Sequence, residues 1–125
     1  MRLAGAPVIA FLATVDARRA RAFYETTLGL KLIEDSAFAV VFEANGTMLR
    51  IQKVAEFAPH AFTAFGWQVG DIAASMALLA REGVAFERYP GLEQDAAGVW
   101  TSPSGARIAW FRDPDGNVLS LTEFP

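Results

Sequence analysis

The sequence predicts an α+β fold built from two βαβββ modules. The main observation is a pattern that occurs twice, in residues 8–32 and again in residues 65–86. Each copy begins with an apolar strand that ends at an aspartate, continues with a helical stretch that ends at a glycine, and returns to an apolar strand. Further strand candidates and turn sequences follow each copy. The chain has 125 residues, which is enough for one domain with a hydrophobic core.

Both predicted helices have a start signal and a stop signal. Asp16 and Asp71 are suited to the N-cap, where a short carboxylate accepts hydrogen bonds from the free amides of the first turn. Gly29 and Gly83 lie where a left-handed residue would end each helix. Between these signals apolar residues recur at helical spacing and give each helix one apolar face. These residues are Ala20, Phe23, Tyr24, Thr27 and Leu28 in the first helix, and Ile72, Met76, Leu79 and Ala80 in the second.

The first half contains four predicted strands, one before its helix and three after it. They are Val8–Thr14, Lys31–Asp35, Phe38–Glu43 and Thr47–Val54. The last two are joined by Asn45-Gly46, a pair that favours a tight hairpin because both residues tolerate a positive φ. The first module therefore extends over about residues 7–54.

The second half repeats this order over about residues 65–124, after a linker at residues 55–64 that carries His60, the only histidine. Its first strand begins near Phe65. The strand candidates after its helix are Val84–Tyr89, Gly98–Ser102 with Ala106–Arg112, and Val118–Phe124. Asp113-Pro114-Asp115-Gly116 predicts a turn, since proline presets φ and glycine tolerates a positive φ. The polar stretch Gly91–Gly98 is predicted to form a loop over a cleft. The two modules make one domain, residues 1–125.

Composition excludes several functional classes. A net charge of −3 and a pI near 5.1 favour no nucleic-acid partner. The absence of cysteine excludes disulfides, thiolate catalysis and cysteine metal sites. The sequence contains no run of about 18 apolar residues, so it predicts no membrane span. We expect a cytoplasmic protein. The apolar fraction of 53% is high and favours burial on both faces of a sheet or in a subunit interface.

The arrangement resembles the vicinal oxygen chelate superfamily, which contains glyoxalases, bleomycin-resistance proteins and extradiol dioxygenases. The resemblance rests on Ala22-Phe23-Tyr24 before Leu28-Gly29-Leu30 and on the closing Asp113-Pro114-Asp115-Gly116-Asn117, and it covers essentially the whole chain. It implies that the two modules curl into a cup-shaped mixed sheet that holds a ligand. It also implies a homodimer, in which modules are sometimes exchanged between chains.

The resemblance further implies a divalent metal held by the first and last strands of each module. In this sequence Ile9, Arg50, Phe65 and Ser120 fall at those four positions. Isoleucine and phenylalanine offer no lone pair, arginine is a permanent cation, and serine is a weak neutral ligand. We therefore expect no metal cofactor. Glu123 follows three residues after Ser120, and strand alternation places it on the opposite face unless a bulge turns it.

The same positions predict a cup lined by aromatic and apolar side chains. The candidate ligand-binding residues are Arg50, Gln52, Phe65, Trp67, Trp100, Trp110 and Ser120. Such a lining suits a ligand with a flat apolar body and one anionic or carbonyl group, because rings stack and a guanidinium binds a carboxylate in bidentate fashion. The plain alternative is that the tryptophans are core residues and that Arg50 faces solvent.

Three functional hypotheses remain open. The first is a metal-independent protein that binds a small, aromatic or anionic molecule. The second is a metal-dependent lyase, isomerase or dioxygenase with relocated ligands, which would need His60 and Glu123 to converge with another acid. The third is a metal-free enzyme in which Arg50 polarises a carbonyl and Glu123 or Tyr89 moves a proton. The identity of the ligand is not encoded in any motif.

Overall fold

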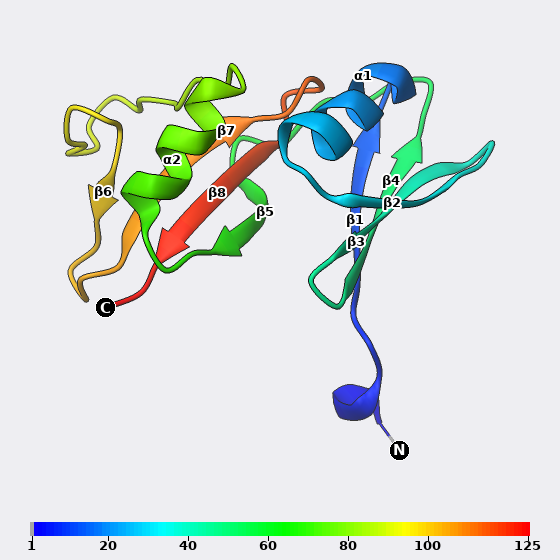
Figure 1. The fold of residues 1–125 in the computed structure, drawn as a ribbon, viewed down its shortest axis with the longest axis horizontal. Helices are drawn as coiled ribbons and strands as arrows, with labels where there is room; N and C mark the ends of the chain where they lie inside the picture. Colours follow the sequence, from blue (N-terminus) through cyan, green and yellow to red (C-terminus); the bar gives the residue numbers. More distant parts are fainter. Residues whose placement is uncertain (1) are drawn as a thin grey trace. The chain divides into compact units, whose positions relative to one another are not determined.

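The computed structural model describes residues 2–125 and contains two four-stranded mixed sheets. The chain divides into two units, Met1–Ala58 and Pro59–Pro125, and the division falls inside the predicted linker. Each unit holds one sheet and one covering helix (Figure 1). The predicted α+β class and the repeated module are confirmed.

The sheet of the amino-terminal unit has the strand order β1-β4-β3-β2. The strands are β1 (Ile9–Thr14), β2 (Lys31–Asp35), β3 (Ala39–Ala44) and β4 (Thr47–Lys53), and a short 3₁₀ turn, η1 (Leu3–Gly5), precedes them. β1 is parallel to β4, and the other pairs are antiparallel. The predicted hairpin between β3 and β4 is confirmed, because Asn45 and Gly46 have φ values of 47° and 91°.

The helix of this unit begins as α1 (Ala17–Ala22) and continues as the π-helical turn η2 (Phe23–Thr27). The Asp16 carboxylate accepts a hydrogen bond from the Arg19 N–H at 3.1 Å, as the N-cap prediction requires. Tyr24 is fully buried, and its ring lies 5.9 Å from that of Phe42 on β3. The helix therefore covers the sheet face that holds Phe42, and within residues 2–58 the only other helical segment is the three-residue η1.

The sheet of the carboxy-terminal unit has the equivalent order β5-β8-β7-β6. The strands are β5 (Thr63–Gln68), β6 (Trp100–Thr101), β7 (Arg107–Arg112) and β8 (Val118–Glu123). The helix α2 (Ile72–Arg81) buries Ile72 and Met76 and lies across β7 and β8 (Figure 1). The Asp71 carboxylate caps it by accepting from the Ala74 N–H at 3.0 Å. None of the helices in residues 2–125 has the length and apolar character needed to cross a membrane.

The predicted strand Val84–Tyr89 is wrong. Only Phe86 pairs there, as an isolated bridge to Phe111 on β7. Further along, the Tyr89 N–H donates to the side-chain oxygen of Gln94 at 2.8 Å rather than to a neighbouring strand. The Gln94 side chain thus takes the hydrogen bond that a neighbouring strand would otherwise make, and the strand pairing ends there. The two-residue β6 forms the edge of the sheet instead.

The turn before β8 forms as predicted. Asp113 is buried, and its carboxylate accepts from the N–H groups of Asp115 at 3.0 Å and Asn117 at 2.9 Å. The Asn117 side chain also donates to Asp113 at 2.8 Å. A short side chain that bonds the backbone two and four residues onward holds such a turn together, and this turn directs the chain into β8.

Candidate functional site

The amino-terminal unit has an open sheet face that carries the predicted residues Arg50 and Gln52. In the β1–β4 register Phe11 lies beside Arg50 and Ile9 beside Met48, so these side chains share the face opposite α1. Ile9 and Phe11 are 47% and 54% exposed, which is unusual for large apolar side chains. The structure thus brings a cation and an amide onto one largely apolar surface.

Arg50 is the charged side chain at the centre of this face. It is half-buried, with Phe11 on one side and Val41 on the other in the strand register. Within residues 2–125 no carboxylate forms an ion pair with Arg50. Lys53, by contrast, pairs with Asp35 at 2.6 Å. A guanidinium that lies beside apolar side chains and forms no ion pair is suited to an anionic ligand.

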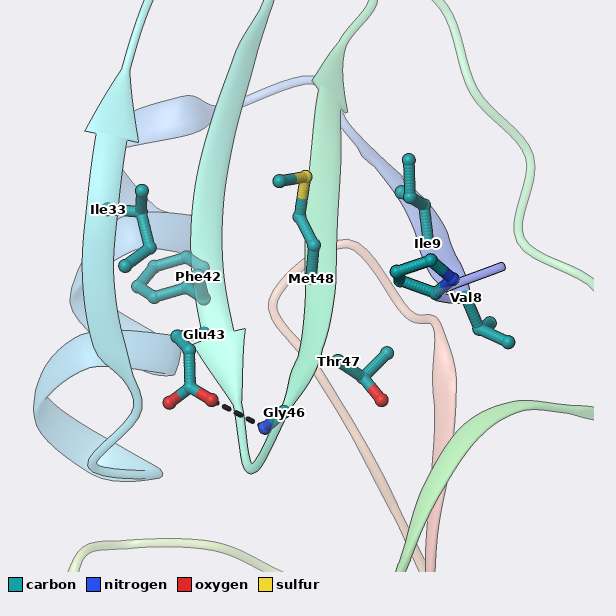
Figure 2. Close-up of a pocket in the computed structure, with 9 residues that line it drawn as sticks. Val8, Ile9, Ile33, Phe42, Glu43, Gly46, Thr47 and Met48 are labelled. Carbon is teal, nitrogen blue, oxygen red and sulfur yellow. Dashed lines mark hydrogen bonds between the residues drawn. The ribbon is translucent and has the colours of Figure 1, made fainter. Parts of the chain in front are cut away.

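A groove of about 510 Å³ lies on the same unit (Figure 2). Its walls are Pro7, Val8, Ile9, Ile33, Phe42, Glu43, Gly46, Thr47 and Met48. Met48 lies beside Ile9 in the strand register, and Figure 2 shows the Glu43 carboxylate directed at the Gly46 N–H, from which it accepts a hydrogen bond. The volume is within the usual range for small-molecule sites. Met48 lies two residues before Arg50, so the groove and the guanidinium share the open face.

In the carboxy-terminal unit Phe65 and Trp67 do not lie where the sequence predicts them. They pair with Leu119 and Leu121 in the β5–β8 register, and the Trp67 ring stacks on the fully buried Phe111 at 6.3 Å. Both side chains are therefore on the α2 side of the sheet. The expectation that they share a face with Ser120 is wrong, because an error of one residue in strand register transfers a side chain to the other face.

Ser120, Trp110 and Trp100 share the sheet face opposite α2. Ser120 is 8% exposed and lies beside Trp110 in the β7–β8 register. The rings of Trp100 and Trp110 are 6.3 Å apart. The Trp110 indole N–H donates to the Thr63 hydroxyl at 3.0 Å, which fixes the orientation of this ring. Sequence reasoning missed Thr63, because it falls in the predicted linker and carries no motif.

Glu123 lies on the opposite face from Ser120, as strand alternation predicts. Its carboxylate accepts from the Ile72 N–H at 2.9 Å at the start of α2, and it pairs with Arg107 at 3.8 Å. An acid at this position stabilises the helix N-terminus. Glu123 therefore has a structural role on the α2 side and supplies no donor to the face that holds Ser120.

The donor chemistry does not fit the divalent metal that the family resemblance implies. Ile9 and Arg50 share the open face of the first unit, and neither can donate an electron pair to a metal. In the second unit Gly66 is beside Ser120, while Phe65 is on the other face. Within residues 2–125 no three His, Asp or Glu side chains gather into a possible metal site. That the protein functions without a metal stays a prediction.

Comparison with known proteins identifies one family. The model of the Glyoxalase/Bleomycin resistance protein/Dioxygenase superfamily matches residues 7–121. No curated protein matches the chain.

Solved structures of the same superfamily share the fold. A glyoxalase/bleomycin resistance protein from Catenulispora acidiphila is 26% identical, with a TM-score of 0.69 over 95% of this chain and 98% of that one. A glyoxalase family protein from Bacillus anthracis is 19% identical, with a TM-score of 0.74 over 95% and 94%. A lactoylglutathione lyase from Agrobacterium tumefaciens is 18% identical, with a TM-score of 0.72 over 95% and 93%.

Proposed function

The chain belongs to the glyoxalase/bleomycin resistance protein/dioxygenase superfamily, and we propose that it binds a small aromatic or anionic molecule without the family's metal ion. In this proposal the protein sequesters its ligand. Metal-dependent lyase, isomerase or dioxygenase chemistry with relocated ligands is the alternative, and no gathering of acids or histidines in residues 2–125 favours it.

The setting of Arg50 is the observation that carries the proposal. The guanidinium is half-buried beside Phe11 and Val41, and it has no acidic partner within residues 2–125. Packing a permanent cation among apolar groups costs free energy unless an anion pairs with it. A ligand carboxylate or phosphate would supply that anion, and Phe11 would contact the apolar part of the same molecule.

The aromatic residues of the carboxy-terminal unit support the other half of the proposal. Trp100 and Trp110 lie side by side on the face that Ser120 shares, and Trp110 is held by Thr63. Rings whose orientation is fixed lose little entropy when a flat molecule stacks on them. We therefore propose Trp100 and Trp110 as contacts for an aromatic ligand.

Titration calorimetry with 2-naphthoate, an anionic aromatic probe, tests the proposal. Losing a hydrogen bond to a charged group costs about 1.5–3 kcal/mol, so Arg50→Ala should weaken binding about 10- to 100-fold. Arg50→Lys should restore only part of the affinity, since the planar fork is lost. Arg18→Ala, on the exposed side of α1, removes the same charge and serves as the control. Equal affinities of Arg50→Ala and Arg18→Ala would contradict the proposal.

We also propose a cytoplasmic homodimer. β1 and β5 are edge strands of their sheets, and edge strands present unpaired backbone groups that pairing would cover. Several large apolar side chains are exposed in the single chain, among them Phe38 at 79% and Phe11 at 54%. Surfaces of this kind mark association sites in soluble proteins.

A further inference from the structure

The carboxy-terminal unit contains a second cavity, of about 260 Å³, on the sheet face that holds Ser120. It is lined by Ala61, Phe62, Thr63, Tyr89, Trp110 and Val118. None of these side chains carries a formal charge at neutral pH, and three of them are aromatic. The cavity is thus a setting for an uncharged ring rather than for an anion.

Tyr89 lines this cavity, and its hydroxyl group is unusual. Its oxygen is buried and has no hydrogen-bond partner within residues 2–125. Leaving a buried hydroxyl unpaired is costly, so most such groups find a partner. Burial also raises the pKa of Tyr89, with a smaller contribution from Glu87, so the group stays a neutral phenol that can donate or accept.

Tyr89 is held in place by its own loop. Its N–H donates to Gln94 Oε1 at 2.8 Å, while Gln94 Nε2 donates to the carbonyls of Glu87 at 2.9 Å and Gly98 at 2.8 Å. The Arg88 guanidinium adds a bond to the Asp95 carbonyl at 2.8 Å. These bonds hold the backbone on both sides of Tyr89, which restricts where its side chain can lie.

Trp110 forms the neighbouring wall in an equally defined way. Its ring lies 5.6 Å from that of Tyr89, at an interplanar angle of 78°. Its indole N–H is already bonded to Thr63 Oγ1 at 3.0 Å. The indole therefore offers its flat surface to a ligand, and the Tyr89 hydroxyl is left to make the directional contact.

We propose that this cavity receives an uncharged ring bearing a hydroxyl or carbonyl oxygen, and that the Tyr89 hydroxyl selects the ligand by bonding that oxygen. This inference rests on the proposed function, because it names the class of aromatic molecule that the tryptophan face of the carboxy-terminal unit would take. Since the hydroxyl is closed off in the free protein, one wall must move as the ring enters. We assign this movement to Phe62, which is 65% exposed, lies outside the strands and stacks on the ring of the neighbouring linker residue His60 at 4.8 Å.

The test uses phenol and toluene, which have nearly the same shape and differ in one oxygen. Binding is followed through the tryptophan indole N–H signals in NMR spectra, and phenol should shift the Trp110 signal more than that of Trp67 on the α2 side. The ratio of the toluene Kd to the phenol Kd should fall about two- to tenfold in Tyr89→Phe, the effect of one neutral hydrogen bond. An unchanged ratio, or no response of Trp110 to phenol, would overturn the inference.

Tyr24→Phe is the matched control, because it removes a hydroxyl from the buried tyrosine of the other unit and should leave the ratio unchanged. In the free protein Tyr89→Phe should unfold at the same temperature as the parent or higher, since no bond is lost. A clear loss of stability would show that the hydroxyl already has a partner and would overturn the inference. If Arg50→Ala leaves the affinity for 2-naphthoate unchanged, only the proposed function is contradicted. That failure is therefore distinguishable from a failure of the phenol and toluene test.

Discussion

Gly66 on β5 lies directly opposite Ser120 on β8, and no side chain fits between them. A Cβ atom at position 66 would come within 2.3 Å of Ser120 Oγ and 3.0 Å of the Ser120 carbonyl oxygen. The backbone of Gly66 has no positive φ, so its requirement for glycine is steric. Ser120 is itself buried, on the face that it shares with Trp110.

Gly66→Ala should therefore destabilise the protein by about 1–3 kcal/mol, the usual cost of overpacking. Thermal unfolding measures the effect. Gly70→Ala is the control, because a Cβ there would meet no atom within 4 Å. Adding Ser120→Ala to Gly66→Ala should recover part of the loss, since the 2.3 Å contact is removed while the carbonyl contact stays. Equal stability of the two glycine variants would mean that β5 and β8 pair in another register.

The purified protein should carry no stoichiometric divalent metal. The reason is the residue types at the four family positions, of which Ile9 and Phe65 have no donor atom and Arg50 repels a cation. Elemental analysis after purification without chelators checks this. About one zinc, nickel, iron or manganese per chain, with binding or activity lost when it is removed, would contradict it.

Trp67 and Trp110 should respond differently to substitution. Trp67 stacks on Phe111 in the α2-side core, so Trp67→Ala should cost stability, about 1–3 kcal/mol for a half-buried ring. Trp110 lies on the other face, and Trp110→Ala should lower the affinity for uncharged aromatic probes such as phenol. Denaturant unfolding and calorimetry on both variants separate the two effects. Trp67→Ala with normal stability and weakened binding would show that the β5 side chains face the other way.

Asp35 should contribute stability that is lost in acid. A hydrogen bond from Lys53 at 2.6 Å holds the pKa of this carboxyl below its usual range, and a hydrogen bond from Arg21 at 3.1 Å makes a smaller contribution in the same direction. A lowered folded-state pKa gives stability that is present above the unfolded-state pKa, roughly 3.9, and is lost as the pH falls through the folded-state pKa. Because the pair is partly exposed, the amount is on the order of 1 kcal/mol or less.

Urea unfolding of the parent and of Asp35→Asn at a series of pH values measures this contribution. The parent should be the more stable protein near pH 7, and the difference should shrink below about pH 4. Raised salt should also reduce it, since a partly exposed pair is screened. If the stability difference between the parent and Asp35→Asn grew as the pH fell, the prediction would be contradicted.

The protein should sediment as a dimer at micromolar concentration. Exposed apolar residues outside the proposed ligand contacts, such as Phe38, favour self-association. Phe38→Glu should shift the equilibrium toward monomer because it would bury a charge, while Leu78→Glu, at an exposed position on α2, should not. A monomer in sedimentation experiments on the parent would contradict the proposal.

The elements whose signals act over a few residues could be predicted before the fold was known. Asp16 and Asp71 cap their helices, Asn45-Gly46 makes its hairpin, and Asp113 organises the closing turn. Each depends on a side chain bonding nearby backbone or on a tolerated positive φ, so neighbouring residues are sufficient to predict it. Strand alternation likewise placed Ser120 and Glu123 on opposite faces, because the period of two is a local property.

The tertiary structure alone decided what depends on partners far along the chain. The face of Phe65 and Trp67 is set by the register of β5 against β8, where the pairing shifts between Thr63 and Phe65, and such a shift leaves no mark in composition. The sequence of residues 84–89 predicts a strand, but in the structure backbone groups of Tyr89 and Glu87 bond to the Gln94 side chain instead of to a neighbouring strand. The contact between Thr63 and Trp110 joins residues that are 47 positions apart, and only folding brings them together.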